Sequence, residues 1–145
     1  MAITTSAVCN SFKKELLEGT HNFKASGGNS FKLSLYTSSA TLGKSTTSFT
    51  TDNQVSNSGQ YVSGRGALTN GGTSVASSVA IVDFADRSFT GVTVTARGAI
   101  IYNDTATGDP AVAVLDFGAD KSATSGTFTI QFPAFTTSAA ILRIT

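Results

Sequence analysis

The sequence contains few of the residues that build reactive or cross-linked sites. Cys9 is the only cysteine and His21 the only histidine, and tryptophan is absent from the 145 residues. One cysteine cannot form an intrachain disulfide or complete a cysteine-based zinc site. One histidine without a Gly-x-Ser-x-Gly turn gives no basis for a Ser–His–Asp triad. We therefore expect no enzyme, no catalytic or metal-binding residues and no cofactor.

Charge and long apolar runs are also scarce. Charged residues make up 13% of the chain, against a usual value of about 25%. The net charge is +1 and the cations are scattered, whereas binding to nucleic acid requires a clustered basic face. No apolar run approaches the roughly 18 residues of a membrane span. The first residues lack a basic stretch followed by an apolar run, so we expect no secretory leader and synthesis in the cytoplasm.

What the sequence does contain is typical of β structure. Serine, threonine and glycine are abundant, and threonine favours strands while serine and glycine favour turns. Residues 38–73 are polar and punctuated by glycine, with weak strands near 48–51 and 61–62. Regular strands are predicted at Phe31–Thr37, Ser74–Phe84, Thr90–Tyr102, Ala111–Phe117, Gly126–Phe132 and Ala139–Ile144. This pattern predicts a mainly β protein, a single antiparallel β-sandwich or barrel with one N-terminal amphipathic helix.

The helix is predicted at residues 6–18 of a single domain that spans 1–145. Ser6 or Thr5 can cap its start and Gly19 ends it. This assignment divides the domain into an N-terminal arm and helix, 1–22, and a β body, 23–145.

The predicted helix carries one apolar stripe. Val8, Phe12 and Leu16 recur at intervals of four residues, and Cys9 and Leu17 widen the stripe. A helix of about thirteen residues is marginal alone in water, so it must dock on another surface. That surface is either the protein's own sheet or a neighbouring subunit. Val8, Phe12 and Leu16 are therefore our candidate intersubunit contacts.

Two segments about 33 residues apart resemble each other. Residues 80–94 and 113–130 both contain two aliphatic residues, Asp-Phe, a second Asp, a cation, Ser and a threonine-rich strand. We interpret them as a repeated strand–turn–strand hairpin. Asp83 and Asp116 are then equivalent structural turn caps that accept backbone amides, and Phe84 and Phe117 fill the core.

Three motifs suggest chemistry but lack part of the required pattern. Residues 38–45 end in Gly-Lys-Ser, yet Ser38 replaces the first glycine of a phosphate loop and a β-like run follows in place of a helix. Asn103–Asp109 could be a calcium loop, but Val114 stands where Glu is needed, so an ordinary hairpin loop is favoured. Cys9 with His21 could form a nucleophile–base pair, although a thiol on an apolar stripe is usually inert.

Four segments of the sequence carry a resemblance to a known family: 11–23 (SFKKELLEGTHNF), 31–42 (FKLSLYTSSATL), 96–103 (ARGAIIYN) and the strand containing Asp116-Phe117-Gly118. On these segments the chain resembles small virion structural proteins of tailed bacteriophages, mainly those of marine hosts. The resemblance covers nearly the whole chain and brings no catalytic residues with it.

The resemblance implies a non-enzymatic head decoration, or cement, protein. Such a protein would bind the major capsid protein of the same phage on the outer surface of the head and stabilise the shell. It would also bind itself, as a homotrimer at threefold points of the lattice. A neck or tail component is the alternative within this class. A carbohydrate-binding β-sandwich is the alternative from another class, but it needs exposed aromatics, and the tyrosines here are Tyr36, Tyr61 and Tyr102.

Overall fold

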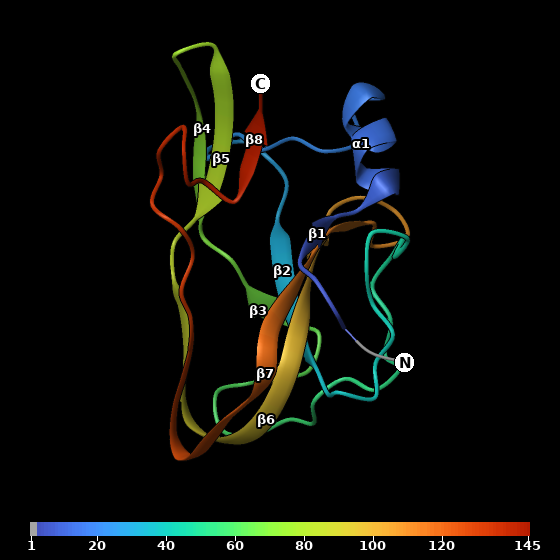
Figure 1. Ribbon diagram of the computed structural model, residues 1–145, viewed down its shortest axis with the longest axis vertical. Coiled ribbons are helices and arrows are strands. Elements are labelled where there is room, and N and C mark those ends of the chain that lie inside the picture. The colour runs from blue at the N-terminus through green and yellow to red at the C-terminus, as the bar shows by residue number, and fades with distance from the viewer. Residues whose placement is uncertain (1–2) are drawn as a thin grey trace.

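Residues 3–145, described by a computed structural model, form two antiparallel sheets and one short helix (Figure 1). Strands account for 48% of the chain and helix for 6%, which confirms the mainly β class. The larger sheet has the order β1-β7-β6-β2-β3, the smaller sheet has the order β4-β5-β8, and neither closes on itself. The elements are β1 (Ala7–Val8), α1 (Asn10–Leu17), β2 (Phe31–Tyr36), β3 (Gly66–Ala67), β4 (Asn70–Ala76), β5 (Val79–Phe84), β6 (Arg87–Asn103), β7 (Ala111–Ile130) and β8 (Leu142–Ile144).

One long bent hairpin, β6–β7, connects the two sheets. Its strands pair from Arg87 opposite Ile130 to Tyr102 opposite Ala111, and residues 104–110 join them. Register shifts interrupt the pairing, one of them between Ala96 and Gly98, and such irregularities bend a strand. In Figure 1 the hairpin descends through the large sheet, curves at the lower end and rises toward the small sheet.

The repeated-hairpin interpretation is wrong. β5 and β6 belong to different sheets, so residues 80–94 do not form a hairpin. The second segment lies inside the single strand β7, where Gly126, predicted to end a turn, pairs with Val92 of β6. The two segments share a local sequence pattern, but β5 pairs with β4 and β8, whereas residues 87–94 of β6 pair with residues 123–130 of β7.

The small sheet contains a hairpin that the sequence prediction merged into one strand, Ser74–Phe84. Ser77 and Ser78 have φ values of 51° and 63° and separate β4 from β5. Two consecutive positive φ values are the signature of a type I′ turn, which usually carries Asn-Gly. The last strand is also shorter than predicted, since β8 begins at Leu142 rather than at Ala139.

β2 is buried on both faces. Ser34 and Tyr36, on the face opposite Phe31, Leu33 and Leu35, are 0% exposed. The long segment before β3 covers them: the Tyr61 hydroxyl accepts a hydrogen bond from the Leu35 amide at 2.8 Å, and the Tyr36 hydroxyl donates to the Thr50 carbonyl at 2.6 Å. The weak strands predicted within 48–51 and 61–62 are only isolated bridges at Ser48 and Tyr61.

The helix starts later than predicted, at Asn10 rather than at residue 6. Ala7 and Val8 instead pair with Val114 and Ala113, because the edge of β7 offers their backbone a partner. Ser6 does not cap the helix: its hydroxyl accepts a hydrogen bond from the Asp116 amide at 2.8 Å. The predicted end at Gly19 is confirmed, since this glycine has a φ of 78° just beyond Leu17.

Candidate interaction surface

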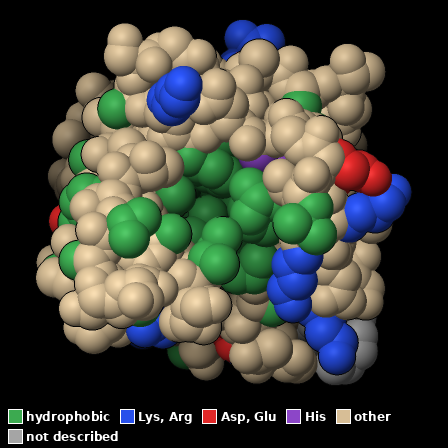
Figure 2. Space-filling model, turned by 90° about the horizontal axis from the view of Figure 1, so that it is seen from above, with side chains coloured by type: hydrophobic (Ala, Val, Ile, Leu, Met, Phe, Trp, Pro, Cys, Tyr) green, Lys and Arg blue, Asp and Glu red, His purple; other side chains and the backbone are tan. Residues whose placement is uncertain are grey.

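An apolar groove of about 1080 Å³ lies between α1 and the small sheet. We call it the α1–β8 groove. The buried side chains of Phe12, Phe23, Ile81 and Leu142 line it and come from four different segments. Figure 2 looks onto this end of the molecule and shows hydrophobic side chains at the bottom of a hollow.

Three large apolar side chains beside the groove face solvent. Leu17 of α1 is 91% exposed, Val75 of β4 is 72% exposed and Ile144 of β8 is 58% exposed, and all three line the groove. Single exposed apolar residues are ordinary, but several around one apolar hollow are typical of an interaction site. The groove therefore presents apolar surface that remains in water when the protein is alone.

Backbone hydrogen bonds hold α1 in place on one side of the groove. The Cys9 amide donates to the Val112 carbonyl at 3.0 Å, which ties the start of the helix to β7. The Asn10 amide donates to the Lys44 carbonyl at 2.8 Å. At the other end the Thr20 amide donates to the Glu15 carbonyl at 2.9 Å, which closes the last turn of the helix itself. The helix is thus fixed against β7 and forms a wall opposite β8.

His21 lies beneath this wall and also lines the groove. The Asn103 amide nitrogen is 3.0 Å from His21 Nδ1, and Glu15 Oε1 is 3.5 Å from Nε2. The His21 ring centroid lies 4.9 Å from that of Phe12. Burial lowers the pKa of His21, and the opposing effect of the Glu15 carboxylate is smaller. A neutral imidazole that accepts at Nδ1 and donates at Nε2 fits these contacts.

Three cations line the groove: Lys13, Lys24 and Arg143. No Asp or Glu is among its lining residues. Within residues 3–145 none of these cations forms a salt bridge, whereas Lys14, off the groove, pairs with Glu18 at 3.2 Å. In Figure 2 blue side chains of Lys and Arg lie beside the hollow. The surroundings of the groove are therefore positively charged and suited to an acidic partner.

The candidate contacts Val8, Phe12 and Leu16 all line the groove. Phe12 is buried and packs on the protein's own core, while Val8 and Leu16 are half-buried against it. Cys9, predicted to widen the stripe, is fully buried, and Leu17 points to solvent instead. Val8 belongs to β1 rather than to the helix, so the predicted stripe is wrong at its start, but all three residues serve the protein's own fold and form part of an open surface.

The opposite wall of the groove was missed in the sequence. Val75, Ile81 and Ile144 come from β4, β5 and β8, far from the helix along the chain. The alternation of Leu142, Arg143 and Ile144 predicted a strand, but a strand pattern does not reveal which surface its apolar face meets.

Asp83 and Asp116 accept backbone amides as expected, but they lie within β5 and β7 rather than in turns, they are not equivalent, and neither lines the groove. Asp83 Oδ1 accepts a hydrogen bond from the Phe84 amide at 2.9 Å, and Asp116 Oδ1 accepts one from the Gly118 amide at 2.8 Å. Asp116 also pairs with Arg97 at 3.1 Å. Asp83 is 3% exposed, and its burial raises the pKa of the carboxyl.

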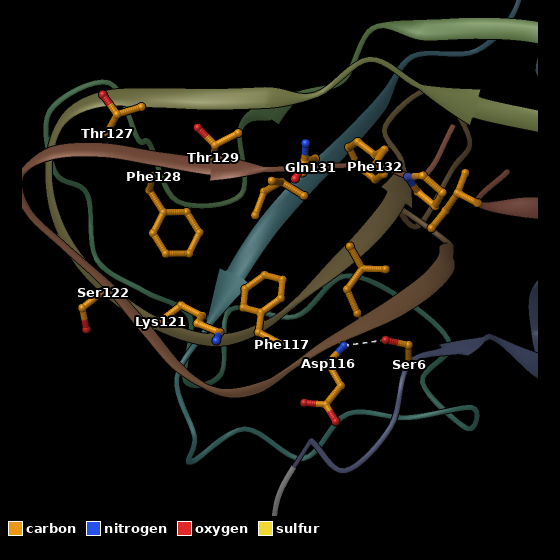
Figure 3. Close-up of a pocket in the computed structure, with 14 residues that line it drawn as sticks. Ser6, Asp116, Phe117, Lys121, Ser122, Thr127, Phe128, Thr129, Gln131 and Phe132 are labelled. Atoms are coloured by element: carbon orange, nitrogen blue, oxygen red, sulfur yellow. Dashed lines mark hydrogen bonds between the residues drawn. The ribbon is translucent and has the colours of Figure 1, made fainter. Parts of the chain in front are cut away.

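A second, more polar hollow of about 510 Å³ lies where β7 bends back on itself; we call it the β7 cleft. Phe117 and Phe128 face each other there with ring centroids 6.1 Å apart (Figure 3). Phe117 is partly buried, so it does not fill the core as predicted, whereas Phe84 is buried. Lys121 and Ser122 lie at one side of the cleft and Thr127 and Thr129 at the other (Figure 3).

The three motifs that suggested chemistry in the sequence lie in places that do not favour it. Burial raises the pKa of the Cys9 thiol to about 11, so the nucleophilic thiolate is scarce at neutral pH. Lys44 lies in a turn closed by the hydrogen bond from the Thr46 amide to the Gly43 carbonyl, and no helix follows it. In the predicted hairpin loop, Asn103 accepts hydrogen bonds from the amides of Thr105 and Ala106. No group of three or more His, Cys, Asp or Glu residues within 3–145 could hold a metal ion.

Comparison of the chain with protein-family models, with curated proteins and with solved structures found no match. In the described part of the chain, no helix has the length and apolar character needed to cross a membrane.

Proposed function

We propose that this protein is a non-enzymatic structural protein of a bacteriophage virion, a head decoration protein that binds the outer surface of the capsid and stabilises the shell. Two independent lines support the proposal. The resemblance of segments 11–23, 31–42 and 96–103 to small virion proteins points to the particle. The α1–β8 groove points to a role in binding another protein.

The groove is the observation that carries the proposal. It combines an apolar floor, exposed Leu17, Val75 and Ile144, and three cations with no carboxylate among the lining residues. A decoration protein needs such a surface because it gains its binding energy from contact with coat subunits. Many copies on a repeating lattice then stabilise the shell, since each copy must detach before the subunits beneath it separate.

In the proposed assembly the protein forms a homotrimer at the threefold points of the shell. A symmetric oligomer at these points contacts several coat subunits at once. The proposal includes the packing of the two sheets as a sandwich, which would provide a rigid body. A neck or tail position is the alternative within the same class.

Counting copies in purified particles tests the proposal. Quantitative mass spectrometry against the major capsid protein should find hundreds of copies per particle. A second measurement compares the thermal release of DNA from particles with and without the protein, and the decorated particles should withstand a higher temperature. Six or twelve copies would indicate a neck or tail component, and absence from the particle would refute a virion role.

A carbohydrate-binding module is the candidate from another class. The β7 cleft favours it, because Phe117 and Phe128 form an aromatic pair beside hydroxyl side chains. The tyrosines weigh against it, since Tyr36, Tyr61 and Tyr102 are all buried and provide no exposed stacking platform. Binding to a glycan array that a Phe117→Ala substitution abolishes would favour this candidate over decoration.

A further inference from the structure

The small sheet has an edge strand that borders the α1–β8 groove. β8 lies at the end of the order β4-β5-β8 and, within residues 3–145, pairs with β5 on one side and with no strand on the other. Figure 1 shows β8 between β5 and α1, with the helix across from its free edge. A free edge presents unpaired backbone donors and acceptors and is a template for another strand.

We infer that the groove binds an extended segment of a partner protein, which adds a strand to the free edge of β8. The segment has apolar side chains at alternate positions and carboxylates at its ends. Alternate side chains of an added strand point to one face, so they would cover Phe12, Ile81 and Leu142, while the backbone pairs with β8. Under the proposed function the partner is the coat protein, and to that extent the inference rests on the proposed function.

The positive charge around the groove favours an acidic partner segment over a neutral or basic one. Lys13, Lys24 and Arg143 line the groove without a salt-bridge partner in the described chain, and no carboxylate lines it. Apolar side chains alone would accept many sequences. Carboxylates near these cations add complementarity and disfavour basic segments.

The same charges argue against a second copy of this chain as the occupant. Antiparallel pairing of two β8 strands about a twofold axis centred on Arg143 would place this residue opposite its own copy. It would also bring together the lysines of both grooves. Like charges directly opposite each other on paired strands are destabilising. A helical occupant is also disfavoured, because its backbone bonds are satisfied internally and cannot pair with the free edge of β8.

Synthetic peptides test the inference on the full chain. The probes are the capped heptapeptide Glu-Val-Thr-Val-Thr-Val-Glu, a twin with Lys in place of both Glu, and a twin with Pro in place of the central Val. We expect the acidic peptide to shift the amide resonances of Leu142–Ile144 and to slow their hydrogen exchange. It should bind at least about tenfold more tightly than either twin.

Two pairs of variants assign the binding to the groove. Lys13→Glu with Lys24→Glu should reverse the preference between acidic and basic peptides, whereas Lys44→Glu with Lys121→Glu makes the same charge change outside the groove and should leave the preference unchanged. Leu17→Asp should weaken binding, whereas Phe135→Asp, at a residue that is 45% exposed and outside the groove, should not. Both positions are solvent-exposed, so the fold should tolerate both substitutions.

Two outcomes overturn the inference. One is that millimolar acidic peptide leaves the β8 amides unchanged, and the other is that the proline twin binds as well as its parent. Palmitate that fills the groove when no peptide does would identify a site for amphiphiles instead. Binding to undecorated shells separates this inference from the proposed function: if the parent and the Leu17→Asp variant saturate shells equally, the groove is not the anchor but decoration stands. If neither binds shells while the peptide results are as expected, the groove is a strand-binding site and decoration fails.

Discussion

At the scale of single residues, Asp83 and Asp116 show how one local motif acquires two environments. Both carboxylates accept the amide of a residue just after them. Asp116 is balanced by Arg97, whereas Asp83 is buried without a cation partner within residues 3–145. A buried carboxylate loses hydration, which disfavours its charged form.

This difference predicts opposite results for the same substitution. Because the pKa of Asp83 is raised in the folded state, ionisation destabilises the fold as the pH rises through that pKa. Asp83→Asn removes this charge and should leave the free energy of unfolding at pH 7 unchanged or raise it. Asp116→Asn loses the pair with Arg97 and should lower it by about 0.5–1 kcal/mol. Urea unfolding at pH 7 measures both, and a larger loss at Asp83 than at Asp116 would contradict this prediction.

His21 should make stability depend on pH. Its pKa in the folded protein is below the ordinary value of 6.5, mainly because it is buried. The unfolded chain therefore binds a proton first as the pH falls. The contribution of His21 is fully present above pH 6.5 and is lost as the pH falls toward the folded pKa, with a limiting slope of about 1.4 kcal/mol per pH unit.

Urea unfolding between pH 7.5 and pH 5 measures this loss. The comparison is with His21→Gln, in which the remaining titrating groups are the same, so the difference between the two slopes isolates the histidine. Equal slopes for the parent and the variant would show that His21 does not titrate differently in the two states.

At the scale of elements, the turn between β4 and β5 is a point of strain. Ser77 and Ser78 both have positive φ, a conformation that costs a residue with a side chain about 1–2 kcal/mol. Asn and Gly adopt it readily. The double substitution Ser77→Asn and Ser78→Gly should therefore raise the free energy of unfolding by about 1 kcal/mol.

The melting temperature measured by circular dichroism checks this prediction. Ser74→Gly is the matched control, since Ser74 lies within β4 opposite Ile81 and a glycine there should lower stability. A double variant that melts below the parent would rule out strain in this turn.

The sequence predicted elements whose pattern is local and missed those that depend on an unusual turn or on distant partners. Strand positions with alternating or branched residues, such as 31–36 and 98–103, were predictable because the pattern is local. The turn at Ser77-Ser78 was missed because serine is not one of the residue types that usually adopt a positive φ. The hairpin assignment of 80–94 failed because β5 pairs with the preceding strand β4, across the unrecognised turn, and with the distant strand β8, rather than with β6. The apolar residues of the helix predicted one wall of the groove. The other wall is formed by β4, β5 and β8, which lie far from the helix in sequence, so it could not be predicted.

At the scale of the whole molecule, the N-terminal segment is part of the core rather than a detachable arm. Ile3, Cys9 and Phe12 are buried, and β1 pairs with β7. A Cβ at Gly98 would lie 2.7 Å from the Ile3 side chain, so the two pack closely. Docking against the protein's own sheet, rather than on a neighbour alone, accounts for these contacts.

Deleting residues 1–19 should therefore prevent stable folding of the rest. The deletion removes three buried apolar side chains and one edge strand of the large sheet, and each such side chain contributes about 1.5–3 kcal/mol. We expect the truncated chain to show no cooperative thermal transition, whereas Leu17→Asp melts like the parent. A truncated body that unfolds cooperatively near the parent's melting temperature would show that the N-terminal segment is dispensable.

The pairing of β1 with β7 also has a consequence for synthesis on the ribosome. Ala7 pairs with Val114, and β2 pairs with residues 98–103 of β6. These later residues must be synthesised before the large sheet can form. The large sheet therefore cannot form on the ribosome before residues 98–114 have left the exit tunnel. The α1–β8 groove is completed later still, because its second wall includes Leu142 and Ile144. A chain truncated before Leu142 therefore cannot present this surface.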